Sequence, residues 1–262
     1  MLKVAITDPL PTALATMTWL QAPTPLTPNI YVGEHAQHGW VKIKLARSQT
    51  DKQLLQREIQ ALKHLSNAPL PYIARYISSF EQNNSYYLLT PWLKGEPLSN
   101  LIRQNRAPLF DWRSQLATAV SHCHQLGFNH GDIKPSNILV MRKQIVLLDF
   151  GASLPHGESL SRVMQYGFSP HFCHPELLTG QGIIRPYHDW YAFAVTVLSA
   201  QGMHPFNGLD ILSAAQQRRQ PHYPSNSRTC YQLLVNQAYA LSLHHSGRFN
   251  SPLSYDKGNE RC

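Results

Sequence analysis

The sequence predicts an α+β fold of two unequal lobes: a small, antiparallel β-rich N-lobe with one key helix, and a larger, mainly α C-lobe. The first third of the chain holds most of the strand patterns and a single long helical pattern, whereas helical patterns dominate from residue 98 onward. The 262 residues, 43% of them hydrophobic, can bury a core, which excludes a wholly disordered chain. We expect a single domain over residues 1–262, with an N-lobe at about 1–90, a hinge at about 91–95 and a C-lobe at about 96–262.

The N-lobe elements follow from periodicity. Residues 1–30 are proline-rich and have weak periodicity. Leu55, Ile59 and Leu62 recur at near-helical spacing and predict a helix over 51–65. Alternating or β-branched runs bounded by polar turns predict strands, which cover residues 30–34, 40–45, 72–80 and 86–93.

The remaining chain reads as helices around a short strand pair. The pattern at 111–127 ends at Gly127, a residue that commonly terminates helices. We expect two short strands in the segment 138–149 and a long irregular loop over 150–176. The other predicted helices lie at 98–105, 189–200, 209–219 and 229–243.

Composition argues against several classes of protein. The formal net charge is +8, but the basic residues are dispersed, which does not favour a nucleic acid as partner. The four cysteines form no C-x-x-C pair, and this argues against a zinc site or a disulfide framework. No apolar run approaches the roughly 20 residues of a membrane span, and the N-terminus lacks the unbroken apolar core of a signal peptide. We therefore expect a soluble, cytoplasmic protein without a membrane partner.

The strongest chemical signal lies in the segments HGDIKPSNILV and LLDFGAS, which carry two carboxylates, an amide and an ammonium in a fixed order. These groups belong to Asp132, Lys134, Asn137 and Asp149. Magnesium prefers hard oxygen ligands, which carboxylates and amides supply. A transferring phosphoryl group needs neutralisation by cations, which the ammonium supplies. The set therefore favours phosphoryl transfer.

The same segments resemble the eukaryotic-like (Hanks-type) Ser/Thr protein kinase family. Its H-R-D-x-x-x-x-N and D-F-G patterns are met at His130–Asn137 and Asp149–Gly151, and the likeness covers roughly residues 30–250. The resemblance implies a compact bilobal kinase that is soluble and bacterial-like. It also implies use of ATP and Mg²⁺, with transfer of the γ-phosphoryl group to Ser/Thr hydroxyls of protein substrates, the protein itself included. A separate regulatory chain is a further expected partner.

The resemblance also implies roles for the C-lobe residues. Asp132 would accept or orient the proton of the substrate hydroxyl, and Lys134 would neutralise charge on the γ-phosphate. Asn137 and Asp149 would hold Mg²⁺. Ser169 lies where the family places a Ser/Thr that contacts the catalytic aspartate.

In the N-lobe, WVKIKLA resembles the V-A-I-K motif, so Lys44 would bind the α- and β-phosphates, with Glu58 as its acidic partner. Lys42 is a rival for this role, because residues two apart in a strand point to the same face. The other nucleotide-binding positions that the resemblance implies are Thr90 (the gatekeeper), Pro91, Leu93 and Leu139.

Three further residues have structural roles in this comparison. Asp189 would anchor the catalytic loop as a buried hydrogen-bond acceptor. Glu176, in an HPE segment that resembles A-P-E, would form an ion pair with Arg248.

The chain departs from the family pattern at the lid of the nucleotide site, where no glycine lies between residues 1 and 32. With Ile30 in place of the family's valine, the glycine positions fall on Pro23, Pro25 and Pro28. Proline has no N–H and a fixed φ, so the phosphates would lose part of their cradle. Lys42 also stands where the family has a small alanine above the adenine.

Gly131 replaces the arginine that binds an activation-loop phosphate in the family, so activity is not expected to depend on such phosphorylation. Two alternatives stay open. The proline-rich lid and Lys42 favour a pseudokinase or scaffold. The H-G-D triplet favours a small-molecule phosphotransferase, which Lys134 and the D-F-G and HPE segments oppose.

Overall fold

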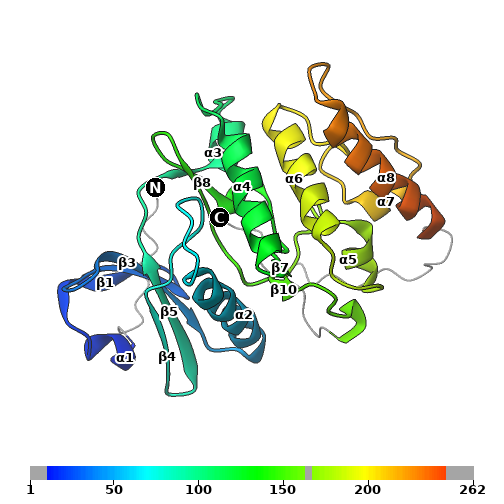
Figure 1. Cartoon of the computed structure of the whole chain (residues 1–262). Helices are drawn as coiled ribbons and strands as arrows, with labels where there is room; N and C mark the ends of the chain where they lie inside the picture. The colour runs from blue at the N-terminus through cyan, green and yellow to red at the C-terminus, as the bar shows by residue number, and fades with distance from the viewer. Residues whose placement is uncertain (1–10, 163–166, 246–262) are drawn as a thin grey trace.

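The structure is a computed structural model of the whole chain, and it describes residues 11–162 and 167–245. A β-sheet with helix α2 (Gln49–Leu65) beside it forms one body, and helices α3 to α8 form most of the other (Figure 1). Short strands labelled β7, β8 and β10 lie between the sheet and the larger helices in the same view. This arrangement agrees with the two-lobed α+β fold that the sequence predicts.

The N-lobe sheet has five antiparallel strands in the order β1-β2-β3-β5-β4. Their bounds are β1 (Trp19–Thr27), β2 (Ile30–His35), β3 (Gly39–Ala46), β4 (Ser78–Gln82) and β5 (Ser85–Pro91). Along β3, Val41, Ile43 and Leu45 pack into one apolar cluster together with Leu14 of the short helix α1 (Thr12–Ala15). Because side chains alternate across a strand, Lys42 and Lys44 point to the opposite face.

Strand β1 is absent from the elements that the sequence predicts, and the expected register of the three prolines is wrong. Pro23 and Pro25 lie within β1, and only Pro28 lies in the turn that joins β1 to β2. Proline cannot donate to a β-ladder and is confined mainly to edge strands. β1 is such an edge strand, because it pairs only with β2, and this position explains how a proline-rich segment becomes a strand.

The predicted strand over residues 72–80 forms only from Ser78 onward. Upstream of β4, Ile73 makes an isolated parallel bridge with Leu147. The N–H of Ala74 donates to Leu147 O at 3.0 Å, and the N–H of Leu147 donates to Tyr72 O at 2.8 Å. The backbone groups of this segment therefore pair with a C-lobe strand, and the segment ties the two lobes together.

The C-lobe surrounds a central helix, α6 (Pro186–Ala200), which is apolar on nearly all sides and therefore buried. It packs against α3, α4 and α8. The other helices are α3 (Leu98–Arg103), α4 (Trp112–Gln125), α5 (Pro175–Thr179), α7 (Ile211–Gln216) and α8 (Thr229–His245), with 3₁₀ turns η1 (Pro135–Asn137) and η2 (Leu160–Arg162). Two small sheets pair β6 (Glu96–Pro97), β8 (Ile138–Val140) and β9 (Ile145–Leu147), and β7 (Phe128–Asn129) with β10 (Leu154–Pro155).

Across residues 11–162 and 167–245, no helix combines the length and the apolarity that a membrane span requires.

Candidate active site

Lys44 joins the two lobes at the site. Its Nζ lies 2.9 and 2.7 Å from the two carboxylate oxygens of Glu58 on α2, and 3.0 Å from Oδ1 of Asp149. Burial disfavours the charged amine, but the carboxylates of Asp149 and Glu58 outweigh it and raise the pKa of Lys44. Of the two candidate lysines, Lys44 is therefore the one that meets Glu58.

The loop after β7 forms a hydrogen-bonded unit around Asp132, whose side chain is only 8% exposed. Lys134 Nζ lies 2.8 Å from Asp132 Oδ2 and donates to Ser169 Oγ at 2.6 Å. The Ser169 N–H donates to Asp132 Oδ1 at 3.1 Å. The Asn137 amide nitrogen donates to Asp132 Oδ2 at 2.9 Å and to its backbone carbonyl at 2.8 Å. Asp132 is thus in direct contact with the other three residues, as the resemblance implies.

These hydrogen bonds prepare two oxygen ligands for a divalent cation. The amide nitrogen of Asn137 is engaged by Asp132, and no donor in the described part of the chain takes its amide oxygen. Asp149 is half exposed and uses only Oδ1 for Lys44. Mainly because of Lys44, the pKa of Asp149 lies well below its ordinary value, so the group is a carboxylate. Oxygen ligands of this kind fit Mg²⁺.

The backbone at the site is held by Asp189, as the sequence predicts. Its Oδ2 accepts from the His130 N–H at 2.8 Å, and its Oδ1 accepts from the Gly131 N–H at 3.0 Å. His124 Nε2 lies 3.0 Å from the same carboxylate. His130 Nδ1 accepts from the Asp132 N–H at 3.2 Å. Asp189 is only 1% exposed, so these contacts are shielded from water.

The glycine in H-G-D has a steric cause. Gly131 has a φ of +84°, and a Cβ added to it would lie 2.3 Å from the backbone oxygen of Ala152. No side chain fits this position without moving the loop. The close approach of these two chain segments thus accommodates glycine and excludes an arginine side chain at this position.

The residues expected to contact the adenine line the connection between the lobes. Thr90 is buried near the end of β5, and Pro91 is its last residue. Leu93 lies two residues beyond Pro91. Between them, the N–H of Trp92 donates to Trp40 O at 2.8 Å. Leu139 on β8 packs against Gly95, where an added Cβ would lie 2.8 Å from Leu139 Cγ. Binding of a base by these residues stays a prediction.

A cavity of about 360 Å³ brings the charged residues together. It opens between the β1–β2 turn, α2 and the catalytic loop. Among the charged side chains that line this cavity are those of Lys44, Glu58, Asp132, Lys134 and Asp149.

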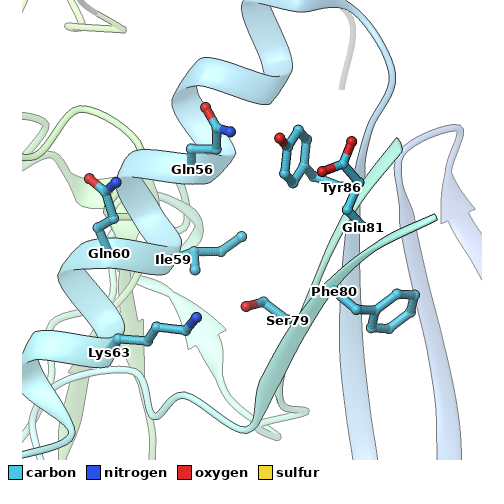
Figure 2. Close-up of a pocket in the computed structure, with 8 residues that line it drawn as sticks. All are labelled: Gln56, Ile59, Gln60, Lys63, Ser79, Phe80, Glu81 and Tyr86. Carbon is cyan, nitrogen blue, oxygen red and sulfur yellow. The ribbon is translucent and has the colours of Figure 1, made fainter. Parts of the chain in front are cut away.

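A second hollow, of about 370 Å³, lies between α2 and strands β4 and β5 (Figure 2). Ile59 points from α2 toward the strands, whereas Phe80 points away from the hollow. Two glutamines and Lys63 border it on the helix side. Its charged residues are Lys63 and Glu81, and none of Lys44, Asp132, Asn137 or Asp149 lines it, so we place the chemistry in the cavity around Lys44.

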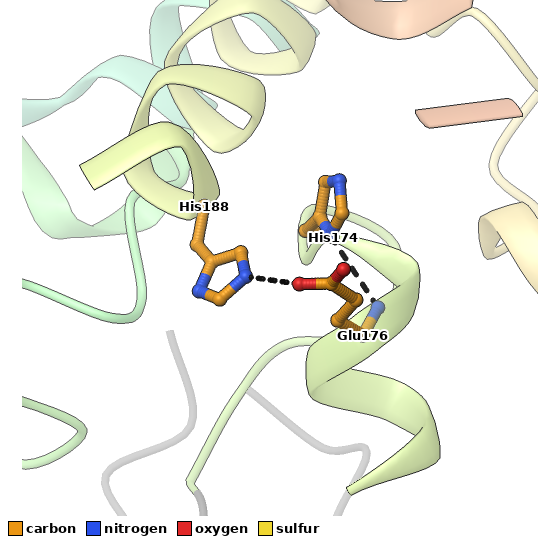
Figure 3. Close-up of side chains that lie close together, drawn as sticks. All are labelled: His174, Glu176 and His188. Carbon is orange, nitrogen blue, oxygen red and sulfur yellow. Dashed lines mark hydrogen bonds and ion pairs between the residues drawn. The ribbon is translucent and has the colours of Figure 1, made fainter. Parts of the chain in front are cut away.

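Glu176 lies in a cluster of hydrogen-bonding side chains (Figure 3). Its Oε2 accepts from Tyr187 Oη and from His188 Nε2, the latter at 2.9 Å. The expected partner, Arg248, lies outside the described residues. No family motif marks Tyr187 and His188, so the sequence does not predict them as partners of Glu176.

Two histidines in this cluster, His174 and His188, share with Glu176 the ligand types of a metal site. The hydrogen bonds of these histidines argue against a metal site. His174 Nδ1 accepts from the Glu176 N–H at 3.4 Å, and His188 Nδ1 accepts from the Arg185 N–H at 3.3 Å. With its Nδ1 accepting, a neutral His188 carries its proton on Nε2, the atom that faces Glu176. The cluster is therefore a structural hydrogen-bond network.

Because of these histidines, we expect the free energy of unfolding to depend on pH. Burial lowers the pKa of His188, and it lowers that of His174 from 6.5 to about 3. Below about pH 6.5 the unfolded chain takes up protons that the folded chain refuses, so the free energy of unfolding falls as the pH is lowered. The slope approaches about 1.4 kcal/mol per pH unit for each such histidine. Urea unfolding between about pH 7.5 and about pH 4.5 measures it.

The matched variant is His174→Asn, because asparagine can still cap the helix but does not titrate in this range. We expect a shallower slope in this variant. A slope equal to that of the wild type would show that His174 does not cause the pH dependence.

Fold and site together define a protein kinase. A family model described as the protein kinase domain matches residues 34–244, which is most of the 262-residue chain. The chain belongs to this family, and the predicted bilobal α+β fold is confirmed.

Three of the curated relatives that the chain matches are named serine/threonine-protein kinases. The serine/threonine-protein kinase dkf-2 of Caenorhabditis briggsae is 26% identical over 209 residues, which cover 74% of this chain and 17% of that protein. Nekl-2 of Caenorhabditis elegans is 30% identical over 173 residues, or 59% and 46% of the two chains. PrkC of Bacillus subtilis is 28% identical over 198 residues, or 72% and 30%. The matches thus span less than half of each relative's length, and they identify the chain as a Hanks-type Ser/Thr kinase family member.

Proposed function

We propose that the protein is an ATP- and Mg²⁺-dependent kinase that transfers the γ-phosphoryl group of ATP to Ser or Thr hydroxyls of protein substrates. The observation that carries the proposal is the contact network around Asp132. It joins Asp132 to Lys134, Asn137 and Ser169. Asp132 and Lys134 line the same cavity as the pair of Lys44 and Asp149. We propose the cytoplasm as its location, because ATP and Mg²⁺ are available there.

The residues divide the work by their chemistry. Lys44, oriented by Glu58, would bind the α- and β-phosphates. Asn137 and Asp149 would hold Mg²⁺, which when bound supplies positive charge beside the phosphate oxygens. Thr90, Pro91, Leu93 and Leu139 would surround the base.

At the acceptor end, Asp132 would orient the substrate hydroxyl and accept its proton, and Lys134 would stabilise the negative charge on the transferring group. The bond from Lys134 to Ser169 places this lysine between the catalytic aspartate and the activation segment. A peptide lying along that segment would present its hydroxyl to Asp132. This placement supports a protein substrate over a small molecule, and the protein itself is one such substrate.

The test is transfer of label from ATP to a generic basic protein and to the protein itself in the presence of Mg²⁺. Asp149→Ala should abolish incorporation, because the variant loses a carboxylate ligand and the partner of Lys44. Thermal unfolding of both proteins controls for folding. Equal incorporation by the wild type and Asp149→Ala contradicts the proposal.

One observation favours a pseudokinase as the second candidate. The β1–β2 hairpin turns at Pro28 and Asn29, and Ile30 already pairs with Lys44, so the hairpin extends little beyond the phosphate-binding lysine. A pseudokinase of this shape would show no thermal stabilisation by ATP with Mg²⁺, since a ligand raises stability only when it binds the folded state. A shift of several degrees would reject this candidate.

A further inference from the structure

Lys42 is a cationic residue on the nucleotide-facing side of β3 to which the proposed reaction gives no role. It pairs across the sheet with Val32 of β2 and with Thr90 of β5. It points to the same face as Lys44, with about 7 Å between their Cα atoms, because each residue of a strand rises about 3.3 Å. Lys42 therefore lies one strand repeat closer to the hinge than the lysine that meets Glu58.

The amine of Lys42 has no hydrogen-bond acceptor or ion-pair partner in the described part of the chain, although its side chain is partly buried. An ammonium carries three donors, and burying them without acceptors is costly. Burial and the nearby charge of Lys44 lower the pKa of Lys42, while Glu58 and Asp149 oppose that shift. The amine therefore interacts electrostatically with the same charged residues as Lys44, but no anionic group is in direct contact with it.

The hairpin above Lys42 and Lys44 offers few donors to a phosphate group. In its two-residue turn, Pro28 has no N–H. The N–H of Asn29 donates to Thr27 Oγ1 at 3.4 Å, and its carbonyl accepts from the Leu45 N–H at 2.8 Å. Arg47 Nη1 donates to Pro28 O at 3.2 Å. The turn is thus tied back to β3, and its backbone does not form the cradle that a glycine-rich loop provides.

We propose that Lys42 replaces part of this missing cradle by donating from β3 to the α-phosphate of the bound nucleotide. The proposal rests on the proposed function only for the direction of the nucleotide, with its base at Thr90 and the hinge and its terminal phosphates at Asp149. Lys42 lies level with Thr90 at the base end, and Lys44 lies two residues further along β3 toward the phosphates. The flexible side chain of Lys42 would extend from the base end toward the α-phosphate. The nucleotide would supply the acceptors that the amine lacks.

The test compares adenosine, AMP, ADP and ATP as ligands of wild-type protein and Lys42→Ala by calorimetric titration. Only the last three carry an α-phosphate. We expect the variant to bind AMP, ADP and ATP about tenfold to a hundredfold more weakly, the effect of one lost hydrogen bond to a charged group. Adenosine binding should change less than about threefold, because adenosine lacks the group that Lys42 contacts.

Two further variants sharpen the result. Lys42→Arg keeps the charge and should retain most of the affinity for AMP. Lys63→Ala removes a lysine from the face of α2 that borders the second hollow, where its amine lies over the Tyr76 ring, and should change nothing. Thermal unfolding should show Lys42→Ala to be at least as stable as the wild type, because the substitution removes an unpaired buried cation.

An unchanged affinity for AMP in Lys42→Ala overturns the proposal. A gain in affinity for all four ligands also overturns it, since Lys42 would then be an obstacle in the base pocket. Absence of binding by the wild type overturns it as well. The readout is independent of catalysis: a wild type that binds nucleotides but transfers no label would contradict the proposed function and leave the role of Lys42 in place.

Discussion

Asp132→Asn should lower the rate of phosphoryl transfer by about 10²–10⁴-fold, the usual contribution of a general acid–base group. An amide cannot accept the proton of the substrate hydroxyl at neutral pH. It also turns a nitrogen donor toward Asn137 Nδ2, Lys134 Nζ or the Ser169 N–H, all of which donate to the carboxylate in the native protein. The measurement is the initial rate of label transfer from ATP.

Nucleotide binding separates this role from a structural one. Asp132 lies on the acceptor side of the cavity, so the affinity for ATP in the presence of Mg²⁺ should change little. Asp111→Asn is the matched control: Asp111 caps α4 by accepting from the Ser114 N–H, and asparagine caps equally well. Loss of ATP binding in parallel with transfer, or a rate close to that of the wild type, would remove Asp132 from its proposed role.

Asp189→Ala should lower the free energy of unfolding by at least about 1–3 kcal/mol, the cost of one buried N–H group that loses its acceptor, because it also leaves a second, partly buried N–H group without one. Those groups belong to His130 and Gly131, which precede Asp132 directly. We therefore expect transfer activity to fall as well, through displacement of the loop. Urea unfolding at neutral pH gives the change in stability.

Asp189→Asn keeps one carbonyl oxygen and should lose less stability than Asp189→Ala. An unchanged urea midpoint in Asp189→Ala would mean that the backbone of the loop is held by other contacts.

Sequence patterns predict most strands of this fold and its helices other than the short α1 and α5, because their causes are local. The 3.6-residue spacing of apolar side chains marks α2, and the alternation along β3 separates Ile43 from Lys44. The contacts within the catalytic loop are also local, since Asp132, Lys134 and Asn137 lie within six residues. The sequence motif therefore suffices to predict that these residues lie together.

The features that the sequence does not predict depend on contacts between distant segments. β1 forms despite Pro23 and Pro25 because only one of its edges needs hydrogen bonds. Residues 72–74 appear strand-like but bond to β9 across the lobes. Gly131 is required by the approach of Ala152, a residue 21 positions later, and no local pattern signals that approach.

The central claim is that a cavity beneath a hairpin with proline in its turn binds ATP through Lys44, Asn137 and Asp149. Calorimetric titration of the wild-type protein with ATP, with Mg²⁺ and then with EDTA, tests this claim most directly. We predict binding that is strengthened by Mg²⁺, and an Asp149→Asn variant in which the effect of Mg²⁺ is largely lost. No heat of binding from the wild type under either condition, with ATP in large excess, would contradict it.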